Sequence, residues 1–423
     1  MSHAHHDFSH LEAPPKVTLP KSFYTVTGAM AAVGLVALLL GFFVLHDPAR
    51  TWKAYLIGYV FFTMVALSGP FFAATQYLTR AGWSPTIRRI PESFTPFLIP
   101  AAALGLIFCI GGIDAVYEWP HEKYHDALIT KKLPYLNTTG MIIRTIVAFA
   151  IWIGLGMWLF RNSIKQDEVG GKALSRLNGR IAPVFVMLMA LALTTFSVDF
   201  VMSLHPHWFS TMWTVNIWVT MWQAGFCLAT IIVLLLHRKG HLKAFINANH
   251  IHDMGKLVFA LTAFWAYIAF CQFLLMWYAN LPEEAIFWNA RMHGGWEWYT
   301  LFMAVFKFIV PFFLLLPRAV KRGKGLMALC AWLIFMCAFE VYWWIVPAPS
   351  PDLGGGAAGH GAGTGGGAEG AHHIVEPVLP WLEVLVFVGF AGLFAMVVGY
   401  TLTKINIIPV KDPRLHEALN HHQ

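Results

Sequence analysis

Six ionisable side chains lie within or beside long apolar segments of the sequence. A charge at the centre of a membrane helix costs about 2.5–3.5 kcal/mol on insertion scales. Such side chains are expected to face the protein interior, to pair or to become neutral, and a buried carboxylate without a cation can take up and release protons. The six residues are Asp114, Arg144, Asp199, Glu297, Lys307 and Glu340.

Helical spacing predicts where some of these side chains point. Thr195, Asp199 and Ser203 are four residues apart and would form a polar stripe on one face of a helix. Glu297 and Lys307 would share one face of a later helix. Carboxylates and cations at similar depths can then meet across neighbouring helices.

Two interpretations of these residues remain open. Arg144 could pair with Asp199, and Lys307 with Glu340, as structural ion pairs that fix helix packing. Alternatively, one cluster forms a proton relay or a quinol pocket, because ionisable groups inside a membrane are functional candidates. Further polar residues would offer relay steps: Ser68, Gln76, Gln223, Thr262 and Tyr267.

A second candidate site follows Asp199 in residues 197–213, which read SVDFVMSLHPHWFSTMW. His205, His207 and Trp208 form a turn that would face a partner on the outer side of the membrane. The alternative is a structural turn whose histidine rings form hydrogen bonds with loop carbonyls.

Histidine and cysteine usage argues against cofactors in this chain. The 20 histidines all fall in tails, loops or the last turn of a predicted span. A transmembrane haem usually needs two histidines on facing helices, so no haem is expected. The five cysteines form no C-x-x-C pattern, which predicts packing residues and neither a disulfide framework nor a metal site.

Composition places the chain in a membrane. Hydrophobic residues make up 57% of the chain and charged residues only 12%, whereas soluble domains carry about 25% charged residues. The net charge of +7 is expected to reflect cationic loops beside a membrane, and no nucleic-acid partner is predicted. Ten segments reach the roughly 20 residues that span a bilayer: 22–45, 53–79, 96–115, 138–160, 181–204, 213–237, 255–279, 296–317, 325–346 and 380–403.

The predicted fold is an all-α membrane protein with two parallel-repeat four-helix bundles, spans 2–5 and 6–9, and two peripheral helices. The repeat is indicated by Asp199 and Glu340, each of which is followed by a proline seven positions later. The predicted divisions are a His-rich tail (1–21), a first helix (22–51), two bundles (52–208 and 209–347), a Gly-rich periplasmic loop (348–379) and a last helix with its tail (380–423).

Lysine and arginine predict the orientation. Tails and loops on the side of both termini hold 20 of these residues, and the opposite loops hold 6. The excess predicts cytoplasmic termini and a multi-pass protein of the bacterial inner membrane.

The ten spans, the four-plus-four repeat and the HPHWFSTMW segment (205–213) together resemble the NrfD/polysulfide-reductase family of membrane subunits. The resemblance covers essentially the whole chain. It is narrowest to the second NrfD-like subunit of alternative complex III, a bacterial quinol:cytochrome c oxidoreductase.

This resemblance implies partners and a setting. The expected partners are membrane lipid, a second NrfD-like subunit, and periplasmic iron–sulfur and multihaem cytochrome c subunits, which would carry the haem c and the iron–sulfur clusters. Quinol-oxidising relatives use a histidine within the bundle beside an aspartate. No histidine lies within a predicted bundle here, although Asp114, Asp199 and Glu340 do, and these carboxylates could serve as the bases that a quinol needs. The resemblance implies that the quinol site lies in the other membrane subunit, and quinol binding by this chain stays an open alternative.

Three functions therefore remain in view. The first is a cofactor-free subunit of the oxidoreductase that anchors redox partners and conducts protons through buried carboxylates. The second is a secondary transporter of the parallel-repeat type, whose substrate site would lie between the repeats. The third is an inert membrane anchor.

Overall fold

The computed structural model describes residues 14–121, 126–349, 377 and 379–421. Ten helical stretches in these residues are long and apolar enough to cross a membrane, and no β-strand occurs among them. The protein is thus an all-α, multi-pass membrane protein. The ten stretches are α1 (Lys21–Phe43), α2 (Pro48–Leu78), α3 to α4 (Arg89–Gly111), α7 (Thr138–Val169), α8 (Ala173–Phe200, with a 3₁₀ turn to Leu204), α9 (Trp213–Arg238), α10 (Ala248–Ala279), α12 to α13 (Trp296–Leu315), α14 (Lys324–Ile345) and α15 (Trp381–Lys404).

Short helices join these stretches. They are α5 (Ile113–Val116), α6 (Ala127–Lys132) and α11 (Pro282–Met292), and a further short helix, α16 (Leu415–Leu419), follows the last stretch. Most of the predicted Gly-rich periplasmic loop (348–379) lies outside the described residues.

The predicted spans coincide with the helices within about five residues, apart from four helix ends. The α3–α4 stretch and α10 begin at Arg89 and Ala248, although their spans were predicted from 96 and 255. Helix α7 continues to Val169, beyond the predicted end at 160, and α8 begins at Ala173 although its span was predicted from 181. The apolar segment ends where charged residues begin, but the helical hydrogen bonds continue beyond that point. The two helices therefore project past their apolar segments as a charged hairpin.

Side-chain caps define several helix starts. Asp47 accepts a hydrogen bond from the amide of Arg50 at the start of α2, and Asn137 accepts one from Gly140 at the start of α7. Asn247 caps α10 in the same way. Each cap satisfies an amide that has no partner within the helix.

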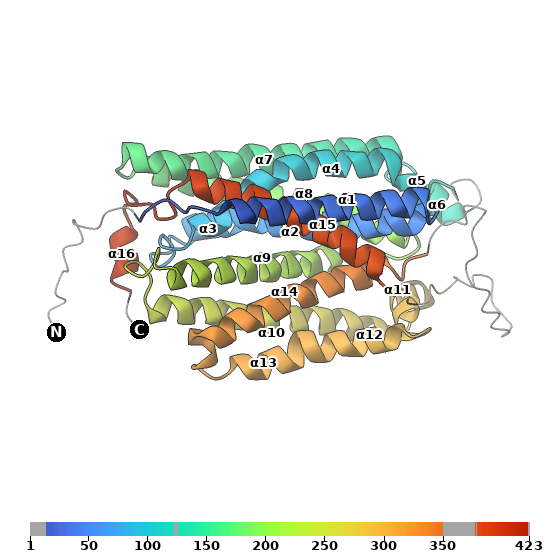
Figure 1. Ribbon diagram of the computed structural model, residues 1–423. Coiled ribbons are helices and arrows are strands. Elements are labelled where there is room, and N and C mark those ends of the chain that lie inside the picture. Colours follow the sequence, from blue (N-terminus) through green and yellow to red (C-terminus); the bar gives the residue numbers. More distant parts are fainter. Residues whose placement is uncertain (1–13, 122–125, 350–376, 378, 422–423) are drawn as a thin grey trace.

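The helices form two four-membered rings with the same order of neighbours. In the first ring α2 packs on α4, α4 on α7, α7 on α8 and α8 on α2. The second ring runs through α9, α10, the α12–α13 stretch and α14, which returns to α9. Helices α2 and α9 contact each other where the rings meet, and Figure 1 shows them between the edge formed by α4 and α7 and the edge formed by α10 and α13.

The first and last spans form a separate pair on the outside of α2. Helices α1 and α15 approach so closely that a Cβ atom on Gly34 would lie 2.4 Å from the Cα of Gly389. Only glycine allows this contact, which replaces the hydrophobic driving force that lipid does not supply between helices. Both described chain ends, residues 14 and 421, lie at one end of the bundle, here called the termini end.

Candidate functional site

The Lys307–Glu340 pair lies in the interior of the second ring. Both side chains are almost fully buried, with relative exposures of 0% and 1%, and the Lys307 ammonium donates to Glu340 Oε2. The Thr220 hydroxyl donates to the same oxygen (2.7 Å) and the Trp265 indole N–H donates to Oε1 (2.7 Å). The carboxylate is therefore held by one cation and two neutral donors, which compensates for its removal from water.

A local irregularity of the helix presents Lys307. The segment η3 (Ala304–Ile309) is a π-helical turn followed by Pro311. Proline lacks the N–H that an α-helix would donate to the carbonyl four residues earlier, and its ring would clash with that carbonyl. A wider turn relieves the clash, and the Trp332 indole donates to the nearby carbonyl of Phe306 (2.8 Å). Such π-turns occur frequently at functional sites.

The second ring contains a further buried polar contact beside this pair. Gln223 donates to the Thr262 hydroxyl (3.0 Å), and the Cys337 thiol donates to the Gln223 carbonyl oxygen (3.4 Å). Gln223 and Thr262 thus lie in the buried interior of the second ring. Tyr267, in contrast, is 62% exposed and points away from the ring interior.

The Arg144–Asp199 pair lies in the first ring, between α7 and α8. Arg144 donates twice to the carboxylate, from Nε to Oδ2 (2.8 Å) and from Nη2 to Oδ1 (3.0 Å), and its guanidinium stacks over Tyr135 at 3.9 Å. This bidentate geometry is the strong form of an ion pair. The Asp199 side chain is 2% exposed, whereas that of Arg144 is 20% exposed.

The exposed part of Arg144 lies at the surface of the helix bundle. A small depression beside it is lined by Arg144, Thr145, Ala148, Thr195, Phe196, Asp199 and Phe200. It is too narrow to hold a water molecule. On the same helix Ile143 and Val147 are more than half exposed, so this surface faces acyl chains in a membrane.

The two pairs occupy corresponding places in the two rings. In each ring the cation lies on the third helix and the carboxylate on the fourth, seven residues before a proline. The Lys307–Glu340 pair is buried in the interior of its ring, whereas the Arg144–Asp199 pair is partly exposed through Arg144. Among the described residues, no side chain hydrogen-bonds to both pairs, so the contacts do not join them into one chain.

Two of the six predicted residues do not join this interior set. Asp114 is the exposed residue of the short helix α5, whose other residues are buried and which packs against α2. Glu297 accepts a hydrogen bond from the amide of Gly295 (2.9 Å) and lies in the first turn of α12. A carboxylate there is stabilised by the helix dipole. Neither residue contacts Lys307 or Glu340.

The predicted partner-facing turn is largely folded inward. His205 and Trp208 are buried, and the Trp208 ring stacks on Phe287 at 4.5 Å between centroids. His207 remains partly exposed and bonds to Asp126 (2.5 Å). The expectation of an outward-facing turn is therefore wrong for His205 and Trp208, since the aromatic residues around them pack into a core at this end of the bundle.

Arg291 lies at the centre of this aromatic core, and the sequence offered no sign of it. Its guanidinium is fully buried and donates to the carbonyls of Phe287 (2.8 Å), Trp343 (3.1 Å) and Trp344 (2.8 Å). His205 Nε2 lies 3.3 Å from Nη1. Burial lowers the pKa of Arg291, and carbonyl dipoles compensate for the missing carboxylate.

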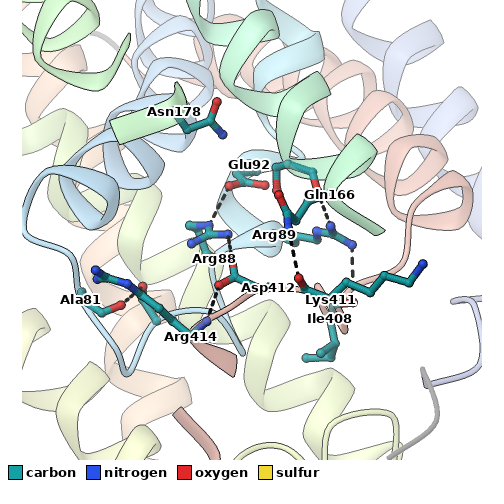
Figure 2. A network of polar contacts seen from close by, with 12 residues as sticks. Ala81, Arg88, Arg89, Glu92, Gln166, Asn178, Ile408, Lys411, Asp412 and Arg414 are labelled. Atoms are coloured by element: carbon teal, nitrogen blue, oxygen red, sulfur yellow. Dashed lines mark hydrogen bonds and ion pairs between the residues drawn. The ribbon is translucent and has the colours of Figure 1, made fainter. Parts of the chain in front are cut away.

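A second network that the sequence did not reveal lies at the termini end (Figure 2). Arg88 pairs with Glu92 (3.0 Å) and with Asp412 (2.7 Å), while Arg89 pairs with Asp167 (2.5 Å) and donates to the carbonyl of Asn406 (2.9 Å). The distant partners Asp167, Asn406 and Asp412 come from α7 and from the C-terminal segment, and the sequence gives no sign that they meet Arg88 and Arg89. Only the fold shows that they hold the C-terminal segment against the first ring.

Comparison with known proteins adds no relative to this geometry. No protein-family model matches the chain, and no curated protein matches it. Within the described residues, no group of three or more histidine, cysteine, aspartate or glutamate side chains is arranged to hold a metal ion. The class that fold and site define is a multi-pass α-helical membrane protein with two repeat-related buried ion pairs.

Proposed function

We propose that this protein is an integral-membrane subunit of a respiratory quinol:cytochrome c oxidoreductase of the alternative complex III type. In this role it packs beside a second NrfD-like membrane subunit and anchors periplasmic redox subunits, which carry the haem c and the iron–sulfur clusters. The proposal rests on the resemblance in residues 197–213. It is supported by ten helices that could span a membrane and by the two four-membered rings.

Within this role, the Arg144–Asp199 pair is the proton-exchange group of the chain. The observation that carries this assignment is the difference in exposure between the two pairs. Arg144 reaches the surface of the helix bundle, whereas Lys307 and Glu340 are both buried. Arginine stays protonated in proteins, so the Asp199 carboxylate is the member of the pair that can accept a proton given up by quinol and release it on the outer side of the membrane. The sealed Lys307–Glu340 pair then fixes the packing of the second ring.

A single experiment tests this assignment in the purified, membrane-reconstituted complex. Asp199→Asn keeps the shape of the side chain but cannot take up a proton, so quinol-driven proton release should fall severalfold while haem content stays unchanged. The matched control is the double variant Lys307→Met/Glu340→Gln, which removes the sealed pair as a whole and should leave proton release unchanged. Equal proton release by Asp199→Asn and the unaltered protein would overturn the assignment.

The subunit assignment has its own test. Mild-detergent purification followed by haem spectroscopy should recover c-type haem with the chain. A stable, haem-free protein that purifies alone would refute the assignment.

The transporter alternative is disfavoured by a contact at the termini end. The C-terminal segment 405–421 bonds to Arg88 and Arg89 beside the first ring and, through His421, to Asp253 of α10 in the second ring (2.5 Å). Rocking of one ring against the other would break these bonds. Substrate uptake into vesicles without any redox partner would support a transporter.

A further inference from the structure

The α7–α8 hairpin carries five exposed cations where it projects past the apolar segments. Arg161 and Lys165 are four residues apart on α7, and Lys172, Arg176 and Arg180 follow at the same interval along α8. Residues four apart share one face of a helix. The cations therefore form one stripe on each helix of the hairpin.

Each cationic stripe continues directly into an apolar one. On α7 the exposed face runs from Lys165 and Arg161 to Trp158 and then to Val147, which are 48% and 51% exposed. On α8 it runs from Arg180 to Val184 and then to the more exposed Met187 and Leu191. An exposed face that changes from apolar to cationic along a spanning helix crosses from the acyl region into the headgroup region.

Hydrogen bonds between α7 and α8 fix how the cations of one helix are placed along the hairpin relative to those of the other. Asn162 donates to the Asn178 side chain (2.8 Å), and Asn178 donates to the carbonyl of Leu159 (3.2 Å). In this antiparallel register Arg161 lies at the level of Arg176 to Arg180. It lies about 12 Å from the tip of the hairpin, at 1.5 Å per residue.

The cations have no carboxylate partner that would neutralise them. None of the five forms an ion pair within 4.0 Å in the described part of the chain. The nearest acids in sequence are Asp167, which is engaged by Arg89, and the exposed Glu168. Lys411 of the C-terminal segment donates to the backbone carbonyl of Glu168 (3.0 Å) and adds a sixth cation.

We propose that this hairpin binds the headgroup of an anionic glycerophospholipid, with its phosphate between the cations of α7 and α8 and its acyl chains along the apolar stripes. Arginine recognises phosphate oxygens through two parallel hydrogen bonds, and polybasic segments beside a membrane attract anionic lipid. An acidic protein segment would satisfy the charges but would leave Trp158 and Val184 without an apolar partner. The continuity of charge and apolar surface therefore favours a lipid.

The test uses the full-length protein in lipid nanodiscs with spin-labelled phosphatidylglycerol, cardiolipin or phosphatidylcholine. In the unaltered protein, the motionally restricted fraction should be larger for the two anionic lipids than for phosphatidylcholine. The variant Arg161→Gln/Arg176→Gln/Arg180→Gln should lower the relative association constant for the anionic lipids about tenfold or more, since each cation near the surface contributes to it. Binding of phosphatidylcholine should not change.

Two further variants make the outcome specific. Arg318→Gln/Arg322→Gln/Lys324→Gln removes the same charge from another exposed cluster at the termini end and should keep the preference for anionic lipid. Arg161→Lys/Arg176→Lys/Arg180→Lys keeps the charge and should retain most of the binding. Unfolding temperatures within a few degrees of the unaltered protein would show that the variants are folded.

Three results would overturn the proposal. One is an unchanged lipid preference in the glutamine variant. Another is an equal loss in the Arg318 control, because the attraction would then come from the general surface potential. The third is protection of the hairpin from spin-labelled lipid by an acidic protein subunit in the assembled complex.

Discussion

Lys307 can stay charged in the interior only because Glu340 is fixed in place beside it. Thr220 and Trp265 hold that carboxylate, and the π-turn aims the ammonium at it. Removing one partner of a buried pair leaves an uncompensated charge, whereas removing both leaves an apolar core of similar volume. The same reasoning predicts a smaller cost at Arg144, which is partly exposed.

Lys307→Met should therefore lower the free energy of unfolding by about 3–5 kcal/mol, since Glu340 would lose its cation. The double variant Lys307→Met/Glu340→Gln should recover most of that loss. Arg144→Met should cost clearly less than Lys307→Met, because the Arg144 side chain is 20% exposed and that of Lys307 is fully buried. Reversible unfolding in mixed detergent micelles measures all three. A double variant that is as unstable as the single one would contradict this account.

At the scale of elements, local chemistry sets helix ends and turns. Pro311 forces the wide turn that carries Lys307, and Gly34 and Gly389 permit the crossing of α1 with α15. At the other end of the bundle, α6 begins at a capping aspartate. Asp126 accepts hydrogen bonds from the amides of Leu128 (2.7 Å) and Ile129 (3.1 Å) and from His207.

Helix α6 should lose stability in acid. The hydrogen bond from His207, together with the amides of Ile129 and Leu128, lowers the pKa of Asp126 below its ordinary value of 3.8. A carboxyl with a lowered pKa contributes stability above its unfolded pKa and loses that contribution as pH falls through its folded pKa. Hydrogen exchange of the α6 amides, corrected for intrinsic rates, should accelerate only below about pH 4.

The control is Asp126→Asn, which keeps a capping oxygen but cannot titrate. Its α6 amides should exchange somewhat faster than those of the unaltered protein at neutral pH and should show no acid transition. A transition of the same size in Asp126→Asn would assign the effect to another group.

At the scale of the whole molecule, the C-terminal segment joins the two rings. It pairs with Arg88 through Asp412, and its last described residue, His421, contacts both Asp253 and the ring of His250. Asn247 also donates to the His421 carbonyl (2.8 Å). These bonds come from both rings, so they oppose relative motion at the termini end.

Breaking both ends of this segment should loosen the rings. Spin labels at the exposed positions 165 on α7 and 243 after α9 should give one narrow distance distribution in the unaltered protein. Asp412→Asn/His421→Ala should broaden it, while Arg318→Gln, which lies outside these contacts, should not. Two distances in the unaltered protein would indicate a rocking transporter and contradict the static arrangement.

Much of this fold could be predicted from the chain alone, because each membrane span must satisfy its own backbone hydrogen bonds and bury about 20 apolar residues. Those constraints are local, and they placed all ten spans and the start of α7 at Thr138. Spacing and charge also favoured the two pairings that the structure contains, Arg144 with Asp199 and Lys307 with Glu340.

The tertiary structure decided what depends on contacts between distant segments. Hydropathy could not show that α7 and α8 extend into the charged hairpin, nor that Asp114 is exposed. Arg291 acquires its role from three backbone carbonyls, two of them about 50 residues away in sequence. The asymmetry between an open and a sealed ion pair is likewise absent from the sequence, because exposure is set by the helices that pack around a side chain and not by its neighbours along the chain.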